Sequence, residues 1–184
     1  MNLTSRYRKS LEQKWALRFK TIHPDGDDCD GVVTHIKSDF IVIKEVGDFE
    51  FDGVVILPKQ VVKGYRDNKY DNCRNEILRQ NGQIGKLKTP KWLDNRGSIV
   101  DVLSAIQKRD IWPAVEMLHN EGKTSAFYIG PIEGVYEDSF YLKCYDAAGK
   151  WEKSYYLTIA NIFRIEFDSK YCRHFNRYMR TVNE

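Results

Sequence analysis

Hydrophobic positions along the chain change their period several times, and these changes divide it into strand-rich and helical regions. Short stretches of β-branched and aromatic residues, separated by turns that contain Gly, Asp or Pro, are typical of β-strands. Stretches of this kind occupy residues 15–22, 31–36, 39–46, 53–66, 112–118, 127–136, 139–146 and 154–167. They predict two groups of five short strands, with a one-turn break at "LPKQ" or "LTIAN" before the last strand of each group.

Directly after each group of strands the period becomes helical. The apolar residues that recur at helical spacing are Tyr70, Cys73, Ile77, Tyr171, Phe175 and Tyr178, which predicts helices at 68–78 and 169–179. Asp67 and Asp168 are the predicted N-caps, because a short acceptor side chain can bond the free amides of a first helical turn. Tyr70 and Tyr171 are predicted to be buried against the strands.

Two further helices are predicted, one before each group of strands. The first begins at Thr4, and the second begins at Ser98, where Asp101 three positions later completes a capping box. The apolar residues of the second helix fall on one face and are Ile99, Val102, Leu103 and Ile106.

The second half of the chain repeats residues of the first half in the same order. Tyr171 follows Tyr70 by 101 positions, and the same offset superposes Lys69 on Lys170 and Asn75 on Asn176. Toward the N-terminus the offset falls to 100 at Leu57, to 99 around Asp39 and to 97 at Trp15.

Short loop insertions change such an offset gradually, so the drift predicts a duplicated module. The alternative is that two unrelated groups of hairpins look alike by chance. The predicted units are residues 1–80 and 98–184, joined by a linker at 81–97.

Five short strands in each unit predict a small, strongly bent sheet that closes so that it leaves no exposed edge. Each unit resembles an Sm-like (SH3-type) small β-barrel. The stretch "IEGVYEDSFYLKCYD" is similar to the first Sm motif, with Asp138 at the family's aspartate position and Asp39 at the equivalent place in the first unit. The expected fold class is therefore mainly β with flanking helices (α+β), built from two tandem Sm/SH3-like small barrels.

The resemblance implies the fold but not the family's RNA site. In the RNA-binding members an Asn follows the aspartate by four residues, whereas this chain has Ile43 and Leu142 there, and neither can hydrogen-bond a base. The Arg-Gly pair between the last two strands is also replaced, by "LPKQVV" and "LTIANI".

Composition and charge set limits on the partners. The chain has 184 residues, of which 42% are hydrophobic and 30% charged, with a net charge of +3, so a packed core and a mixed, mildly basic surface are expected. No stretch reaches the roughly 18 apolar residues of a membrane span, and "MNLTSRYRKSLEQK" lacks the apolar core of a secretory signal. We therefore expect a cytoplasmic protein without membrane contact, whose four widely spaced cysteines are reduced thiols.

The chemical signatures predict no catalytic residue, metal or cofactor. "EGKTS" lacks the first glycine of a phosphate-binding loop, and "DGDDCD" lacks the ligand spacing of a calcium loop. Cys172 and His174 lie two apart on a helix and face different directions. A pair formed in space, such as Cys144 with His35, is left open.

Three classes of function follow from this chain. The first is a non-catalytic interaction module for a protein partner, of an inhibitor, immunity or regulatory type, with self-association through barrel edges also possible. The alternative is RNA or single-stranded nucleic-acid binding, and the second alternative is an unrecognised enzyme. The predicted nucleic-acid contacts are the basic residues of the two helices that end the units: Lys170, Arg173, Arg177, Arg180, Lys69 and Arg74, with Arg79 beside them.

Overall fold

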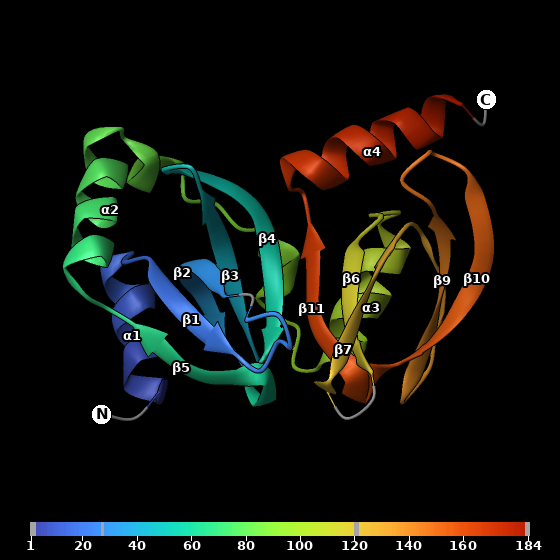
Figure 1. Cartoon of the computed structure of the whole chain (residues 1–184), viewed down its shortest axis with the longest axis horizontal. Helices are drawn as coiled ribbons and strands as arrows, with labels where there is room; N and C mark the ends of the chain where they lie inside the picture. The colour runs from blue at the N-terminus through green and yellow to red at the C-terminus, as the bar shows by residue number, and fades with distance from the viewer. Residues whose placement is uncertain (1–2, 27, 120–121, 183–184) are drawn as a thin grey trace.

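The computed structural model describes residues 3–26, 28–119 and 122–182, and the protein is mainly β with four α-helices (Figure 1). The first half contains, in chain order, α1 (Leu3–Gln13), β1 (Leu17–Thr21), β2 (Cys29–Ile36), β3 (Phe40–Gly47), β4 (Glu50–Pro58), η1 (Lys59–Val61), β5 (Val62–Arg66) and α2 (Lys69–Gln80). None of the described helices is long and apolar enough to cross a membrane.

The second half follows two short 3-10 turns, η2 (Gln83–Lys86) and η3 (Lys91–Leu93). It contains α3 (Ile99–Lys108), β6 (Ala114–His119), β7 (Thr124–Ile129), β8 (Ile132–Val135), β9 (Ser139–Tyr145), β10 (Trp151–Thr158), η5 (Ile159–Asn161), β11 (Ile162–Phe167) and α4 (Lys170–Thr181). The predicted one-turn breaks are confirmed as η1 and η5, and the four predicted helices are confirmed as α1 to α4.

The strands form two open sheets. Eight strands are ordered β5-β1-β2-β3-β4-β11-β6-β7, and three are ordered β10-β9-β8. The prediction of two closed barrels is therefore wrong, because β4 pairs with β11 of the other half and continues the sheet across both halves. Antiparallel partners at this junction are Ile56 with Ile165 and Val54 with Phe167.

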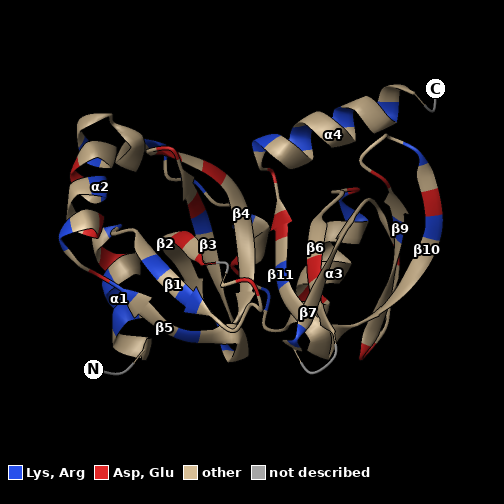
Figure 2. Cartoon of the chain, viewed as in Figure 1, with Lys and Arg blue, Asp and Glu red and all other residues tan. Residues whose placement is uncertain are grey.

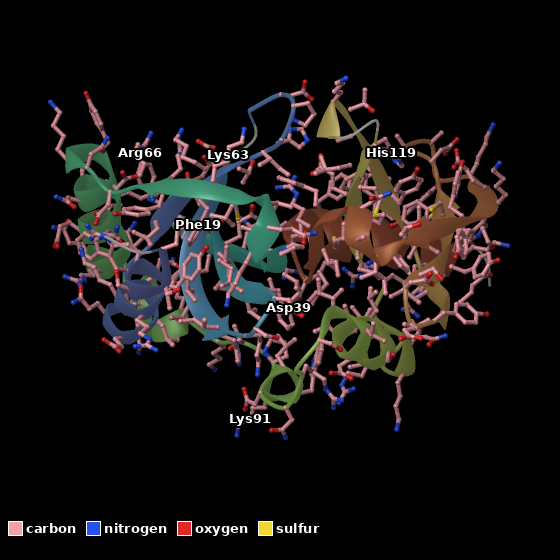
Figure 3. The ribbon with its side chains drawn as sticks, turned by 90° about the horizontal axis from the view of Figure 1, so that it is seen from below. Phe19, Asp39, Lys63, Arg66, Lys91 and His119 are labelled. Carbon is pink, nitrogen blue, oxygen red and sulfur yellow. The ribbon has the colours of Figure 1, made fainter. Side chains whose placement is uncertain are left out.

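β4 forms a wall between two cores. Val54 and Ile56 belong to the hydrophobic cluster of the second half, whereas Val55 and Leu57 belong to that of the first half. Successive side chains of a strand point to opposite faces, so β4 is apolar on both faces and reads as a continuous apolar run. Phe19, completely buried in the first-half cluster, lies inside that half in Figure 3.

The N-terminus of α4 is fixed to the β3–β4 hairpin. The Lys170 amide donates to the Asp52 carboxylate at 2.8 Å. Gly53 lies so close to this turn that an added Cβ would stand 2.9 Å from the Ser169 Cβ. A second link joins His23, after β1, to Glu116 of β6, with Nε2 and Oε1 separated by 2.6 Å. The two halves are thus tied by side chains as well as by strand pairing.

The predicted caps and buried faces of α2 and α4 are wrong by one residue. Asn68 and Ser169, not Asp67 and Asp168, cap the two helices. The buried residues are Asp71, Asn75 and Leu78 on α2 and Cys172 and Met179 on α4, so Tyr70 and Tyr171 are 65% and 45% exposed. Ser98 and Asp101 form the predicted capping box of α3.

The hydrogen bonds of two asparagines, the buried Asn75 and the half-buried Asn176, explain this shift of face. The Asn75 amide donates to the Ala16 carbonyl at 2.9 Å, and its oxygen accepts from the Ala16 amide at 2.7 Å. At the equivalent place in the second half, Asn176 donates to the Trp112 carbonyl at 2.7 Å. Pro113 has no amide hydrogen, and the Asn176 oxygen accepts instead from the Tyr145 hydroxyl at 2.7 Å.

Tyr171→Ala is expected to lower the free energy of unfolding by only about 1 kcal/mol, because the exposed ring contributes mainly through its contacts with Phe127 and Phe175. Tyr70→Ala, at the equivalent place on α2, is the control and is expected to cost less. Thermal and urea unfolding of both variants measure this. A loss of several kcal/mol for Tyr171→Ala would contradict the exposed placement.

Candidate functional site

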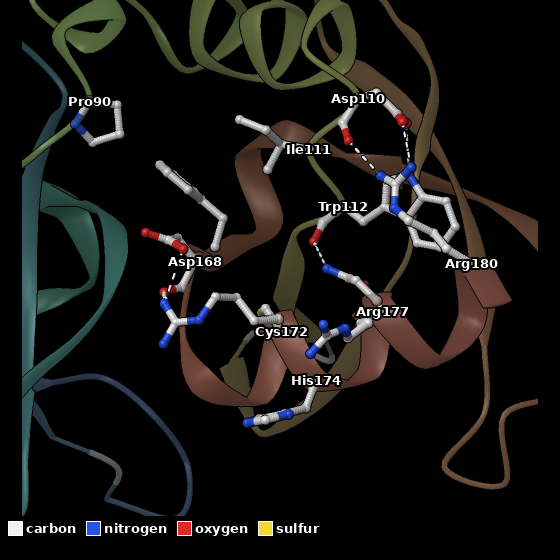
Figure 4. Close-up of a pocket in the computed structure, with 12 residues that line it drawn as sticks. Pro90, Asp110, Ile111, Trp112, Asp168, Cys172, His174, Arg177 and Arg180 are labelled. Carbon is white, nitrogen blue, oxygen red and sulfur yellow. Dashed lines mark hydrogen bonds and ion pairs between the residues drawn. The ribbon is translucent and has the colours of Figure 1, made fainter.

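A cavity of about 720 Å³ opens beside α4, where this helix faces the segment that leads from α3 into β6 (Figure 4). Its apolar lining consists of Pro90, Ile111, Trp112, Phe167 and Cys172. Its polar lining consists of Asp110, Asp168, Arg173, His174, Asn176, Arg177 and Arg180. We call this cavity the α4 groove.

The helical period of α4 brings three of the predicted basic residues to the groove. Arg173, Arg177 and Arg180 are four and three residues apart, so they share one face of the helix. The three guanidinium groups differ in what holds them.

Arg180 is held by Asp110 and Trp112. It donates to the Asp110 carboxylate at 2.6 Å and to the Asp110 carbonyl at 2.8 Å, and it lies 4.1 Å from the centre of the Trp112 ring. The Trp112 indole also donates to the Asp110 carboxylate, at 2.8 Å. The hydrogen bond from Arg180, followed by that from Trp112, lowers the pKa of Asp110 despite partial burial, so this carboxylate is ionised near neutral pH.

Arg173 is held at the entrance of the groove. It donates to the Asp168 carboxylate at 3.0 Å and to the Asp168 carbonyl, and it lies 3.7 Å from the Asp52 carboxylate. Asp168 has φ 57°, a left-handed conformation that aspartate tolerates better than most residues. Arg173 thus ties α4 to the loop before it and to the β3–β4 hairpin.

Arg177 is the exception among the three. Its side chain is exposed, and no hydrogen bond or ion pair links it to any residue in the described ranges. Figure 4 shows the Arg177 guanidinium without a dashed line to any other residue drawn. The groove therefore contains one basic group whose charge is not balanced by a carboxylate of the described chain.

The equivalent place in the first half is closed. Asp67, which corresponds to Asp168, accepts from Arg6 at 3.1 Å and from Lys9 at 3.2 Å, both on α1, and its side chain is only 11% exposed. The Asp168 side chain is 56% exposed. In the second half Trp112 donates to Asp110 and not to Asp168, whereas Trp15 donates to Asp67 at 3.4 Å. In the second half, among the described residues, no preceding helix contacts the aspartate in this way, and there the groove is open.

The other predicted basic residues do not join this surface. Lys170 pairs with Glu50 of the β3–β4 hairpin. Arg74 is largely buried between Asp30, at 2.8 Å, and Asp71, at 3.3 Å. Lys69 lies over the Tyr70 ring at 5.2 Å. Figure 2 shows α2 and α4 apart, in different halves of the molecule, with acidic residues on the strands between them.

The two positions that correspond to the RNA-binding Asn of Sm-like proteins are buried in this chain. Ile43 and Leu142 are completely buried and cannot meet a base. Burial raises the pKa of Cys144 to about 12, so its thiol is protonated, while His35 is paired with Asp94 at 2.8 Å. Within the described ranges no group of three or more His, Cys, Asp and Glu side chains could hold a metal ion. Asp27 of "DGDDCD" and the start of "EGKTS" lie outside the described residues.

Sequence reasoning missed the wall of the groove opposite α4. Asp110 and Ile111 follow α3 directly, and Pro90 belongs to the predicted linker. The predicted repeat contained one usable signal, since Trp112 corresponds to Trp15 and Arg180 to Arg79. Arg180 stacks on Trp112 at 4.1 Å, and Arg79 stacks on Trp15 at 5.2 Å.

The α4 groove combines an apolar floor, one unbalanced guanidinium and two guanidinium groups already paired with carboxylates. Such a site can hold a ligand that presents an apolar body and a negatively charged group. No protein-family model, curated protein or solved structure matches this chain.

Proposed function

We propose that this protein is a non-catalytic binding module that recognises a protein partner through the α4 groove. The observation that carries the proposal is the opening of this apolar cavity in the second half at a place that α1 closes in the first. Fixed, half-buried apolar groups such as Ile111 and Trp112 favour an occupant that buries side chains.

A protein partner is favoured over nucleic acid by the charges around the groove. Arg173 and Arg180 are already paired with Asp168, Asp52 and Asp110, so the groove offers a phosphate backbone only one arginine without a carboxylate partner among the described residues. A nucleic acid that tracked both basic helices would also have to reach α2, where Arg74 is already neutralised by two carboxylates.

The proposal predicts a site-specific protein cross-link. A photo-reactive phenylalanine analogue is placed at His174, which lines the groove, and at Cys73, the exposed equivalent on α2, in the cells that produce the protein naturally. We expect a nuclease-resistant protein adduct from position 174 and none from position 73. The same adduct should disappear when Ile111→Glu places a charge in the apolar floor.

Each other outcome has a definite meaning. A nuclease-sensitive adduct at position 174 would replace the proposal with nucleic-acid binding. No adduct at 174, or equal adducts at 174 and 73 that persist in Ile111→Glu, would show that the groove does not bind a macromolecule. Circular dichroism of each variant checks that it is folded.

We also infer that the two halves arose by duplication of one Sm-like unit. Support comes from equivalent hydrogen bonds: Lys59 N donates to Asp39 O at 2.7 Å, and Ile159 N donates to Asp138 O at 2.8 Å. Strand pairing supports it too. The order β5-β1-β2-β3-β4 of the first half corresponds in the second half to β11-β6-β7 in the large sheet, followed by β8-β9-β10 in the small sheet. The predicted boundaries at 80 and 98 remain predictions.

Self-association by repeating the β4–β11 junction is not favoured. In the second half Lys153 of β10 stands where β4 has Gly53, the residue that lets the next unit approach. A lysine on an edge strand disfavours further pairing.

A further inference from the structure

We propose that the occupant of the α4 groove is an acidic segment of the protein partner, with carboxylates that pair with Arg177 and an apolar side chain that covers Ile111 and Trp112. This inference rests on the proposed function and names its ligand class.

The first argument is the balance of charge inside the groove. Asp110 is satisfied by Arg180 and by the Trp112 indole, and Asp168 is satisfied by Arg173. Of the three arginines that line the groove, Arg177 is the one without a carboxylate partner in the described part of the chain. The acidic side chains of the lining are Asp110 and Asp168. A guanidinium at the edge of an apolar cavity binds best to a carboxylate, which accepts two parallel hydrogen bonds from it.

The second argument is the difference between the two repeats. With the offset of 101, Arg180 corresponds to Arg79 and Lys170 to Lys69, so these basic residues belong to both helices. Arg177 corresponds to Glu76, which pairs with Arg79 at 3.4 Å on α2. The charge is thus reversed at a position that lines the open groove, so α4 has a guanidinium that is free among the described residues where α2 has the acidic partner of Arg79.

The third argument is the shape of the floor. The Trp112 ring is held between Arg180 on one side, at 4.1 Å, and the Trp151 ring, at 5.7 Å in an edge-on arrangement. An indole fixed in this way is a preorganised apolar surface, and an apolar side chain next to an acidic residue would cover it at small entropic cost. Free phosphate offers the charge but no apolar group beside it, whereas single-stranded nucleic acid offers bases that stack on an indole and is therefore a competing ligand in the test.

The test uses a random 12-residue peptide library displayed on phage and selected on the full-length protein, with counter-selection on Arg177→Glu. We expect the bound pool to be enriched in Asp and Glu beside apolar residues. A synthetic peptide from that pool should bind Arg177→Glu about tenfold to a hundredfold more weakly than the wild type, and its Asn/Gln version should lose affinity similarly. Arg177→Gln is a second variant and should weaken binding less than the reversal does.

Lys69→Glu is the matched control, because it changes an exposed basic residue on α2 by the same net charge and should leave peptide affinity unchanged. An enriched pool without acidic residues, no enriched pool, or equal loss in Lys69→Glu would overturn the inference. So would tighter, Arg177-dependent binding of an oligouridine probe at physiological salt. If the cross-link at position 174 is found while the peptides show no acidic preference, the inference fails and the proposed function stands.

Discussion

Gly53→Ala is expected to lower the free energy of unfolding by about 2 to 5 kcal/mol, because the new methyl group meets the helix turn that joins the two halves. Gly53 has φ +54°, a left-handed conformation that costs an L-residue energy. The added Cβ would also lie 2.9 Å from the Ser169 Cβ and 3.2 Å from its Cα. Ser169 cannot retreat easily, since its side chain accepts from the Cys172 amide and caps α4.

Gly82→Ala separates these two causes. Gly82 has φ +65°, but an added Cβ would meet nothing within 4 Å, so only the backbone cost of about 1 kcal/mol is expected. Urea unfolding of both variants and the wild type measures the difference. Equal losses for the two variants would show that the close approach of β4 to α4 does not stabilise the protein.

Local features of the fold were predictable from the sequence. Most of the strands, η1, η5 and the capping box at Ser98 and Asp101 depend on neighbouring residues and on periodicity within one element, whereas the single strand predicted at 127–136 is divided into β7 and β8, so the described part of the second half has six strands and not five. They were found because a period of two or 3.6 residues is visible in a short window.

Features that depend on distant segments were not predictable in the same way. Burial of Asn75 comes from its hydrogen bonds to Ala16, 59 positions away, and a pattern of apolar residues does not contain that information. The pairing of β4 with β11 is also non-local, so the sheets were expected to close within each half.

The same limit applies to the α4 groove. Its helical face was predictable, because Arg173, Arg177 and Arg180 have helical spacing. The sequence could not show that Asp110 neutralises Arg180 while Arg177 is left without a carboxylate, since that depends on a contact across 70 positions.

Asp71→Ala is expected to lower the free energy of unfolding by about 3 to 5 kcal/mol, since it breaks a buried network of charges. The Asp71 side chain is fully buried and accepts two hydrogen bonds from Arg66, both at 3.0 Å. It also lies 3.3 Å from Arg74, which pairs with Asp30 at 2.8 Å. Without Asp71, the largely buried Arg74 keeps only one carboxylate.

Asp101→Ala is the control for the helix cap. Asp71 and Asp101 both complete capping boxes, with Asn68 and Ser98, but Asp101 is exposed and belongs to no charge network among the described residues. Its replacement should cost about 1 kcal/mol, the value of a lost cap. The excess loss in Asp71→Ala then measures the network, and equal losses in the two variants would contradict the assigned role of Asp71.

The pH dependence of the stability lost in Asp71→Ala provides an independent check. Burial by itself raises the pKa of Asp71, but the hydrogen bonds from Arg66 and the Asn68 amide and the charge of Arg74 outweigh it, so the pKa is lowered from its ordinary value of 3.8. A carboxylate with a lowered pKa stabilises the folded state above its unfolded pKa and loses this contribution as the pH falls through the folded one. The difference in unfolding free energy between wild type and Asp71→Ala should therefore be constant from neutral pH down to about pH 4 and shrink below it. A difference that instead grows on acidification would mean that Asp71 is protonated in the folded protein, and the network would then lack its central charge.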